Sequence, residues 1–188
     1  MSDSDSAADR IEYRKRNAVD PEAFLLDLKV VEPTERGENL RFAPEFTERI
    51  ETQLECVRAD GVETSDVATM FGANEDDVTD PGREYTAYKI HATVRNWPSD
   101  AALELDVATD RELQTETDRW ADVPGRQRYN ILQSLRSFHD ECPFCNGEVS
   151  ISDETVESCC GDLEVVTVNC RDCGRRLLEF SADAVPDA

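Results

Sequence analysis

CPFCNG, at residues 142–147, is the first of two CxxC motifs in the chain, and CRDCG, at residues 170–174, is the second. Two residues between cysteines let one tight turn present both sulfurs to a single ion, and four thiolates suit the tetrahedral preference of Zn²⁺. The small residues after each motif let backbone N–H groups approach the sulfurs. The spacing therefore predicts one structural zinc ion held by Cys142, Cys145, Cys170 and Cys173.

The residues between and after the two motifs have the pattern of short strands. Val149 and Ile151 alternate with polar neighbours, residues 165–168 are rich in valine, and Gly161-Asp162 supplies a turn. Apolar residues at 177–180 supply a closing strand. This order resembles the zinc-ribbon family over about residues 140–181. The resemblance implies a β fold whose four-cysteine site leaves no coordination position open, so that zinc is structural rather than catalytic.

Three further side chains near these motifs leave alternatives open. Cys159 and Cys160 are either ordinary thiols near the tip of the hairpin, or functional ones. In the second case one replaces a CxxC ligand, or the pair is redox-active. His139 could also be a ligand. The other interpretation places it at a helix C-terminus, where a partly cationic ring suits the helix dipole.

Residues 124–139 are predicted to form a helix that Asp122 caps and that has Pro124 in its first turn. One face carries apolar residues at helical spacing: Ile131, Leu132, Leu135 and Phe138. The opposite face carries a cationic stripe with an aromatic in it: Arg126, Tyr129, Gln133 and Arg136. With Arg171, Arg175 and Arg176 near the second motif, this stripe predicts contact with phosphates and stacking on a base. The alternative is an ordinary solvated face.

The N-terminal part is predicted to be mainly helical, over about residues 10–139, after a disordered acidic tail at residues 1–9. The predicted elements are a helix at 21–31, a hairpin at 28–42, a helix at 45–59 that stops at Gly61, a helix or strand at 83–97, and a helix at 99–119 broken near Thr109-Asp110. The end of the first helix overlaps the hairpin and could form either. With the ribbon at 140–181 and a tail at 182–188, the predicted fold class is α+β.

Residues 64–79 have the spacing of a helix-turn-helix unit. A helix capped by Thr64 or Ser65 runs to Phe71, Gly72 makes the turn, and a second short helix starts at Asn74. With the preceding hairpin, this resembles winged helix-turn-helix proteins over about residues 22–80. The second helix is acidic and has no Arg or Lys. A packing or protein-docking unit is therefore favoured over direct recognition of DNA.

The composition is strongly acidic, with 42 Asp+Glu against 20 Lys+Arg and a net charge of −22 over 188 residues. Only three of the cations are lysines, which resembles the proteins of extreme halophiles. Three stretches depart from this background and are rich in arginine: residues 10–16, 81–97 and 119–139. They predict either pairing with nearby carboxylates or a local anion-binding face. No apolar run is long enough to span a membrane, and no export signal is present, which predicts a cytoplasmic protein.

No P-loop, GxGxxG, GxSxG or HExxH motif occurs, and we expect no enzyme activity. The leading hypothesis is a zinc-binding, nucleic-acid-associated protein, namely a transcriptional regulator or accessory factor acting on DNA or RNA. The alternative is a protein–protein adaptor with a structural zinc ribbon. A third hypothesis is a thiol-based sensor that uses Cys159 and Cys160.

Overall fold

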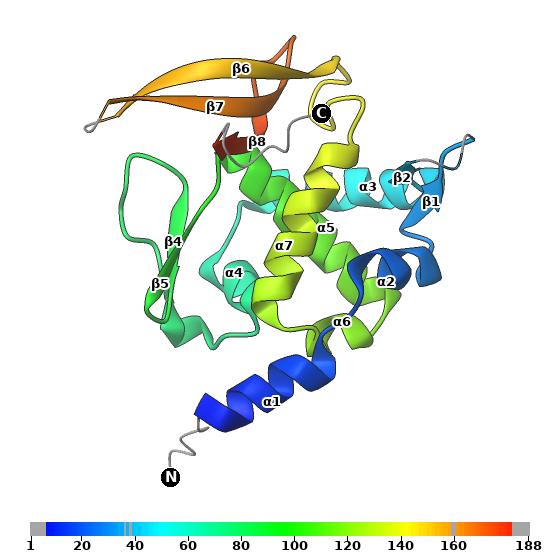
Figure 1. Ribbon diagram of the computed structural model, residues 1–188, viewed down its shortest axis with the longest axis vertical. Coiled ribbons are helices and arrows are strands. Elements are labelled where there is room, and N and C mark those ends of the chain that lie inside the picture. Colours follow the sequence, from blue (N-terminus) through cyan, green and yellow to red (C-terminus); the bar gives the residue numbers. More distant parts are fainter. Residues whose placement is uncertain (1–6, 36, 38, 159–160, 182–188) are drawn as a thin grey trace.

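The structure is a computed structural model that describes residues 7–35, 37, 39–158 and 161–181 (Figure 1). The fold is α+β, as expected: helices form a body, one antiparallel sheet lies beside it and another lies across one end. The helices are α1 (Ala7–Asn17), α2 (Pro21–Asp27), α3 (Pro44–Asp60), α4 (Thr64–Phe71), η1 (Glu75–Asp77), α5 (Asp100–Glu116), α6 (Arg119–Asp122), α7 (Gly125–Leu135) and η2 (Arg136–Phe138). The strands are β1 (Val31–Pro33), β2 (Leu40–Phe42), β3 (Val78–Thr79), β4 (Ala87–Ile90), β5 (Thr93–Asn96), β6 (Val149–Ser158), β7 (Gly161–Cys170) and β8 (Arg176–Ser181).

Helices α3, α5 and α7 form the centre of the body. The predicted apolar face of α3 is buried, with Phe46, Ile50 and Leu54 each at most 1% exposed. Ser99 caps the start of α5, and its hydroxyl accepts a hydrogen bond from the amide of Ala102. The expected break near Thr109 is wrong, because α5 runs unbroken and the Thr109 hydroxyl bonds back to the carbonyl of Leu105.

The ambiguous segment after residue 21 forms both a helix and a hairpin. Helix α2 ends at Asp27, four residues earlier than the longer helix prediction. Lys29 then adopts a left-handed conformation with φ 55°, which redirects the chain into β1. Strands β1 and β2 pair antiparallel, with Val31 opposite Phe42, so the predicted hairpin is confirmed.

The helix-turn-helix prediction is wrong in its second half. Helix α4 ends at Phe71, and Gly72 takes the left-handed conformation that the turn requires (φ 62°). Residues 75–77 then form a single 3₁₀ turn, because Val78 leaves it to pair with Ile90 in an antiparallel sheet. Residues 72–80, all of them described, therefore contain no second α-helix, and a winged helix-turn-helix is not confirmed.

The predicted helix at 124–139 is confirmed as α7 followed by the 3₁₀ turn η2. Its apolar face is buried, as predicted, at Ile131, Leu132 and Leu135. Asp122 is not the cap, because it belongs to the short helix α6, and α7 starts after Pro124 without a side-chain cap. Among the described residues, none of the helices is long and apolar enough to cross a membrane.

The C-terminal sheet has the order β6–β7–β8 and confirms the strands predicted around the cysteines. It is joined to the helical body at β8. Leu177 is fully buried in the common core, the Arg136 side chain donates to the Leu177 carbonyl at 2.7 Å, and the Ser99 hydroxyl donates to the Arg176 carbonyl. The sheet is therefore packed onto the body (Figure 1).

Candidate metal centre

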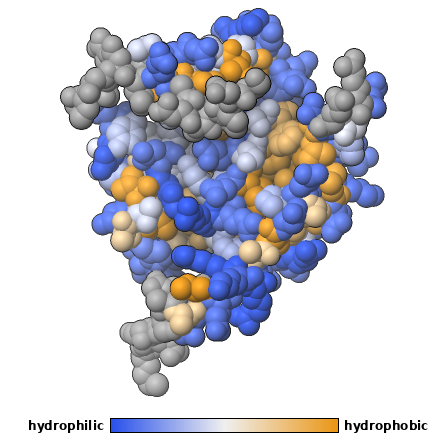
Figure 2. Space-filling model, in the orientation of Figure 1, coloured by the Kyte–Doolittle hydropathy of each residue, from blue (hydrophilic) through white to orange (hydrophobic). Residues whose placement is uncertain are grey.

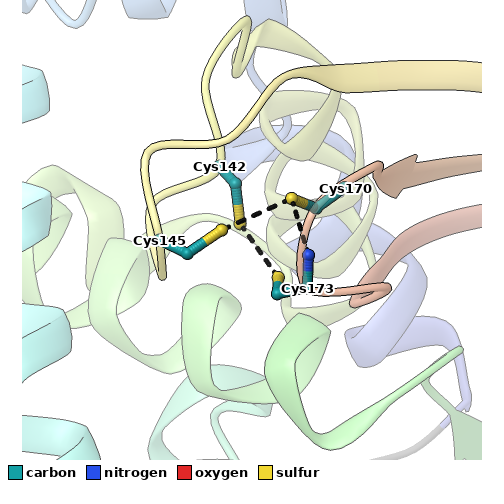
Figure 3. Close-up of side chains that lie close together, drawn as sticks. All are labelled: Cys142, Cys145, Cys170 and Cys173. Atoms are coloured by element: carbon teal, nitrogen blue, oxygen red, sulfur yellow. Dashed lines mark hydrogen bonds between the residues drawn. The ribbon is translucent and has the colours of Figure 1, made fainter.

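The four cysteines of the two CxxC motifs lie together, with all four sulfurs within 4.8 Å of one another. The Sγ atoms of Cys142 and Cys173 are 3.7 Å apart, and those of Cys145 and Cys170 are 3.5 Å apart (Figure 3). A tetrahedral zinc ion with Zn–S bonds of about 2.3 Å places its sulfurs about 3.8 Å apart. The arrangement suits one structural zinc ion, as the spacing predicts.

Backbone hydrogen bonds within each motif shape the two turns. The Cys142 carbonyl accepts from the amides of Cys145 and Asn146, and the Cys170 carbonyl accepts from the amide of Gly174 at 3.0 Å. Gly147 lies where the two turns meet, and a Cβ at that position would collide with the side chain of Asp172. The small residue after the first motif is therefore required by the close approach of the second.

The surroundings of Cys142 and Cys173 shift the pKa values of the two thiols in opposite directions. Burial raises the pKa of the Cys142 thiol to about 12. Burial also acts to raise the pKa of Cys173, but hydrogen bonds from the backbone and side chain of Arg175 outweigh it and lower the pKa to about 6. A buried thiol with so high a pKa ionises only when a cation compensates it, and zinc supplies that charge. Arg175 offsets part of the remaining negative charge of a four-thiolate site.

The site is closed by protein ligands. Cys142 and Cys170 are buried, and Cys145 lies on the solvent side. Four cysteine ligands leave no position for a substrate or a reactive water, so the centre suits a structural ion. Cys159 and Cys160, the proposed alternate ligands or redox pair, lie outside the described residues.

His139 lies beside the centre but is not one of its ligands, since the cluster consists of the four cysteines. Its ring is 8% exposed and its centroid is 4.9 Å from that of Phe42. Burial lowers the pKa of His139 from 6.5 to about 4. The expectation of a partly cationic ring is therefore wrong: the ring is neutral near pH 7.

The neutral His139 makes stability depend on pH. Because its folded pKa is below its unfolded pKa, the unfolded state binds more protons between pH 6.5 and 4, and stability falls as the pH is lowered through that window. We expect the wild type to lose about 3 kcal/mol more than His139→Phe across it, measured by urea unfolding at several pH values. If the free energies of unfolding of the two proteins changed in parallel with pH, the low pKa of His139 would be contradicted.

Two family models match this chain. One, described as the central domain of a family of unknown function (DUF8054), matches residues 20–137. The other, described as the C-terminal domain of the same family, matches residues 140–180. The chain belongs to the DUF8054 family. No curated protein and no solved structure matches it. The boundary between the two DUF8054 domains lies at residues 137–140, at the end of η2 and just before Cys142, where the helical body meets the cysteine-bearing sheet.

The cationic stripe predicted on α7 of this DUF8054 chain does not form. Tyr129 is buried against Phe71 and Trp97, and its hydroxyl donates to the carbonyl of Asn96. Arg136 is only 2% exposed. Arg126 stays exposed at the other end of the helix. Helical spacing assigns residues to a face, but β8 and the β5 region cover part of the face that was expected to be solvated.

Arg136 lies in a buried ion pair with Asp106 of α5. The Nε atom of Arg136 is 3.0 Å from Oδ1 of Asp106, although its N–H does not point along that line. The indole of Trp97 donates to the other carboxylate oxygen at 2.7 Å. Burial raises the pKa of Asp106 to about 6, against the opposing charge of Arg136 and the hydrogen bond from Trp97. The pair therefore joins α5 to the start of η2.

The arginines near the second cysteine motif also have partners within the protein. Arg171 pairs with Glu148 at 2.9 Å, and Arg176 pairs with Glu154 and Glu179. Arg175 lies over the ring of Phe144, 5.0 Å from its centroid. Of the six predicted nucleic-acid contacts, Arg126 is the exposed arginine for which the described residues show no ion pair.

A hollow that the sequence did not predict brings together one or two arginines from each of the three basic stretches. We call it the arginine hollow, lined by Arg14 and Arg16 of α1, Arg95 of β5 and Arg126 of α7. The clustering of arginines in the stretches 10–16, 81–97 and 119–139 was the available signal. Their convergence depends on tertiary packing, which spacing along the chain does not show.

Proposed function

We propose that this protein is a cytoplasmic, non-enzymatic zinc protein that associates with nucleic acid as a transcriptional regulator or accessory factor. The observation that carries this proposal is the arginine hollow. Within the described residues its four arginines form no ion pair, although carboxylates outnumber cations two to one in the chain. Arg95 lies over the ring of Tyr129, 5.6 Å from its centroid, which leaves its charge without a carboxylate. Guanidinium groups without an ion pair at one place on an acidic protein favour a phosphate-bearing partner.

The cysteine-bearing sheet has the features of a zinc ribbon: two CxxC turns, a long hairpin and a closing strand. In this proposal its zinc holds the sheet against the body and takes no part in binding. The need for four reduced thiols favours the cytoplasm, where thiols are kept reduced. On the face shown in Figure 2, hydrophilic side chains separate several hydrophobic patches. The net charge of −22 is in keeping with a protein suited to high salt.

The alternative is an adaptor that binds other proteins. The observation that favours it is the pairing of Arg136, Arg171 and Arg176 with carboxylates of the same chain. These pairs remove the basic surface that was predicted around the metal centre. They leave the sheet as an acidic surface that suits a protein partner better than a nucleic acid.

Capture of nucleic acid by the intact, zinc-loaded protein tests the proposal. The protein is crosslinked at molar KCl, where nonspecific binding is suppressed, purified under denaturing conditions, and the attached nucleic acid is sequenced. We expect a defined set of sites from the wild type. Replacing Arg95 and Arg126 with serine should reduce recovery by at least about tenfold, because an arginine–phosphate hydrogen bond contributes about 1.5–3 kcal/mol.

The matched control replaces Arg41 and Arg171, which are exposed and paired with Glu32 and Glu148. It removes the same charge from the protein and should leave recovery unchanged. An empty capture from folded wild-type protein would overturn the proposal and favour the adaptor. Equal losses in the two variants would show that net charge, rather than the arginine hollow, governs binding.

A further inference from the structure

We infer that the arginine hollow binds one unpaired nucleotide, with its phosphate between the arginines and its base against an aromatic ring. The inference rests on the proposed function and names the ligand of the hollow. It follows from the size of the hollow, from the charges around and behind it, and from the two aromatic rings in its wall.

The hollow is a cavity of about 530 Å³ between α1, the β4–β5 hairpin and the start of α7. In Figure 1 α1 lies below the body, next to the end where α7 begins. Arg14 and Arg16 line it from α1, Arg95 lines it from β5, and Arg126 lines it from α7. Asp9 also lines it. Four like charges around one cavity repel one another, and an anion between them relieves that repulsion.

A fifth arginine lies behind the wall. Arg128 is 3% exposed, donates to the Thr69 carbonyl at 3.0 Å, and has a buried Nε atom with no hydrogen-bond partner. Gly72 lines the hollow, and the Nη2 atom of Arg128 lies directly behind it. A Cβ atom added to Gly72 would be 2.7 Å from that nitrogen. Asp110 of α5 offsets part of this buried charge, and the remainder adds to the positive potential of the hollow without filling it.

The start of α7 adds backbone donors to the same wall. Pro124 and Gly125 line the hollow, and no side chain caps the helix there. The first amides of an α-helix carry its positive partial charge; in α7 the amide of Gln127 donates to the Pro124 carbonyl at 2.7 Å, which leaves those of Gly125 and Arg126 for a ligand. Together with the arginines they suit the oxygens of a phosphate.

Two aromatic rings provide a place for a base. Tyr13 of α1 is 41% exposed, and Phe71, at the end of α4, is half-buried; both line the hollow. Bases of a single strand stack on such rings, with about 1–3 kcal/mol lost per base when the ring is removed. The Tyr13 hydroxyl also donates to the Asp122 carbonyl at 3.0 Å, which holds α1 beside the body.

The hollow is too small to enclose a duplex. A sphere of equal volume is about 10 Å across, less than the roughly 12 Å width of the major groove of B-DNA alone. A single nucleotide fits, either free or as a unit of a single strand. Both sources present the same chemistry, a base carrying a phosphate ester, and the experiment separates them.

Fluorescence anisotropy of the intact, zinc-loaded protein at molar KCl tests the inference. The probes are a short labelled single strand and the same sequence annealed as a duplex, with AMP as an unlabelled competitor. We expect the single strand to bind at least about tenfold more tightly than the duplex. Displacement by AMP would identify a free nucleotide as a sufficient ligand, and its failure would assign a unit within a strand.

Variants of Tyr13 separate stacking from simple charge attraction. Tyr13→Ala should weaken binding of the single strand about tenfold, while Tyr13→Phe, which keeps the ring, should bind like the wild type. Tyr85→Ala is the matched control, because Tyr85 is similarly exposed (47%) and lies beside Arg83 away from the hollow. Replacing Arg95 and Arg126 with serine should abolish single-strand binding.

The outcomes distinguish this inference from the proposed function. Duplex binding as tight as single-strand binding, or unchanged binding by Tyr13→Ala, would overturn the inference. If crosslinking captures nucleic acid whether or not Arg95 and Arg126 are present, the inference falls and nucleic-acid association stands. If AMP binds in the hollow but no strand does, the ligand assignment stands and nucleic-acid association falls.

Discussion

Cys170→Ser is expected to release the zinc and unfold the C-terminal sheet. Cys170 is buried and its sulfur is 3.5 Å from that of Cys145, so its loss removes a ligand from the interior of the centre. Zinc binding to four-ligand sites in small domains contributes about 10–16 kcal/mol, as large as the total stability of a typical domain. We expect a loss of at least about 5 kcal/mol, measured by thermal unfolding together with the zinc content.

Cys56→Ser is the matched control, since Cys56 is a free, exposed cysteine on α3. It should keep one equivalent of zinc and change stability by at most about 0.5 kcal/mol. Treating the wild type with a chelator should reproduce the effect of Cys170→Ser. A Cys170→Ser protein that keeps its zinc and its melting temperature would show that the four cysteines do not form a structural metal centre.

The metal centre could be predicted from sequence because its determinants are local. Each CxxC turn is built by hydrogen bonds between residues at most five apart, and a valine-rich run marks the strand between them. The glycine at position 147 is also part of this local signal, because the side chain of Asp172 comes so close that only a small residue fits there. The same locality explains the successful prediction of α3 and of the β1–β2 hairpin.

The errors come from contacts between distant segments. Residues 74–78 have the local pattern of a helix, but Val78 pairs with Ile90, and that strand pairing limits the helix to one turn. Thr109 and Asp110 have low helix propensity, yet α5 continues through them because its side chains are buried on nearly every face. Tertiary packing overrides propensity at both places.

The wrong prediction of the cationic stripe has a similar cause: helical periodicity does not show which part of a helix face other elements cover. Arg126 and Arg136 belong to one face of α7 in sequence, but β8 covers one end of it, and Arg136 becomes a buried partner of Asp106. Asp106 is one of 42 acidic residues, and nothing in its sequence context distinguishes it from those on the surface. The arginine hollow is missed for the same reason, since its parts come from α1, β5 and α7.

Arg136→Met is expected to destabilise the protein by about 3–5 kcal/mol at pH 7 or above. Its removal leaves the fully buried Asp106 without a compensating charge, and breaking a buried pair on one side is costly for that reason. It also removes the hydrogen bond to the Leu177 carbonyl that joins the sheet to the body. Urea unfolding, followed by fluorescence of the buried Trp97 and Trp120, measures the change.

Arg171→Met provides the matched control. It breaks an ion pair with Glu148 whose side chains are 60% and 66% exposed, and pairs of this kind contribute at most about 1 kcal/mol. Asp106→Asn combined with Arg136→Met should recover part of the loss, because the amide carries no charge and can still accept from Trp97. Equal losses for Arg136→Met and Arg171→Met would show that the buried pair contributes no more than a surface pair.

The pH dependence identifies the charge on Asp106 as the cause. Burial raises its folded pKa from 3.8 to about 6, so its protonated form favours the folded state at low pH and this stabilisation is lost as the pH rises through 6. Without Arg136 that pKa rises further. The difference in stability between the wild type and Arg136→Met should therefore shrink as the pH falls from the raised pKa of the variant to about 6, and stay nearly constant below that. A difference that stays constant with pH would assign the loss to packing and to the Leu177 hydrogen bond, rather than to an uncompensated carboxylate.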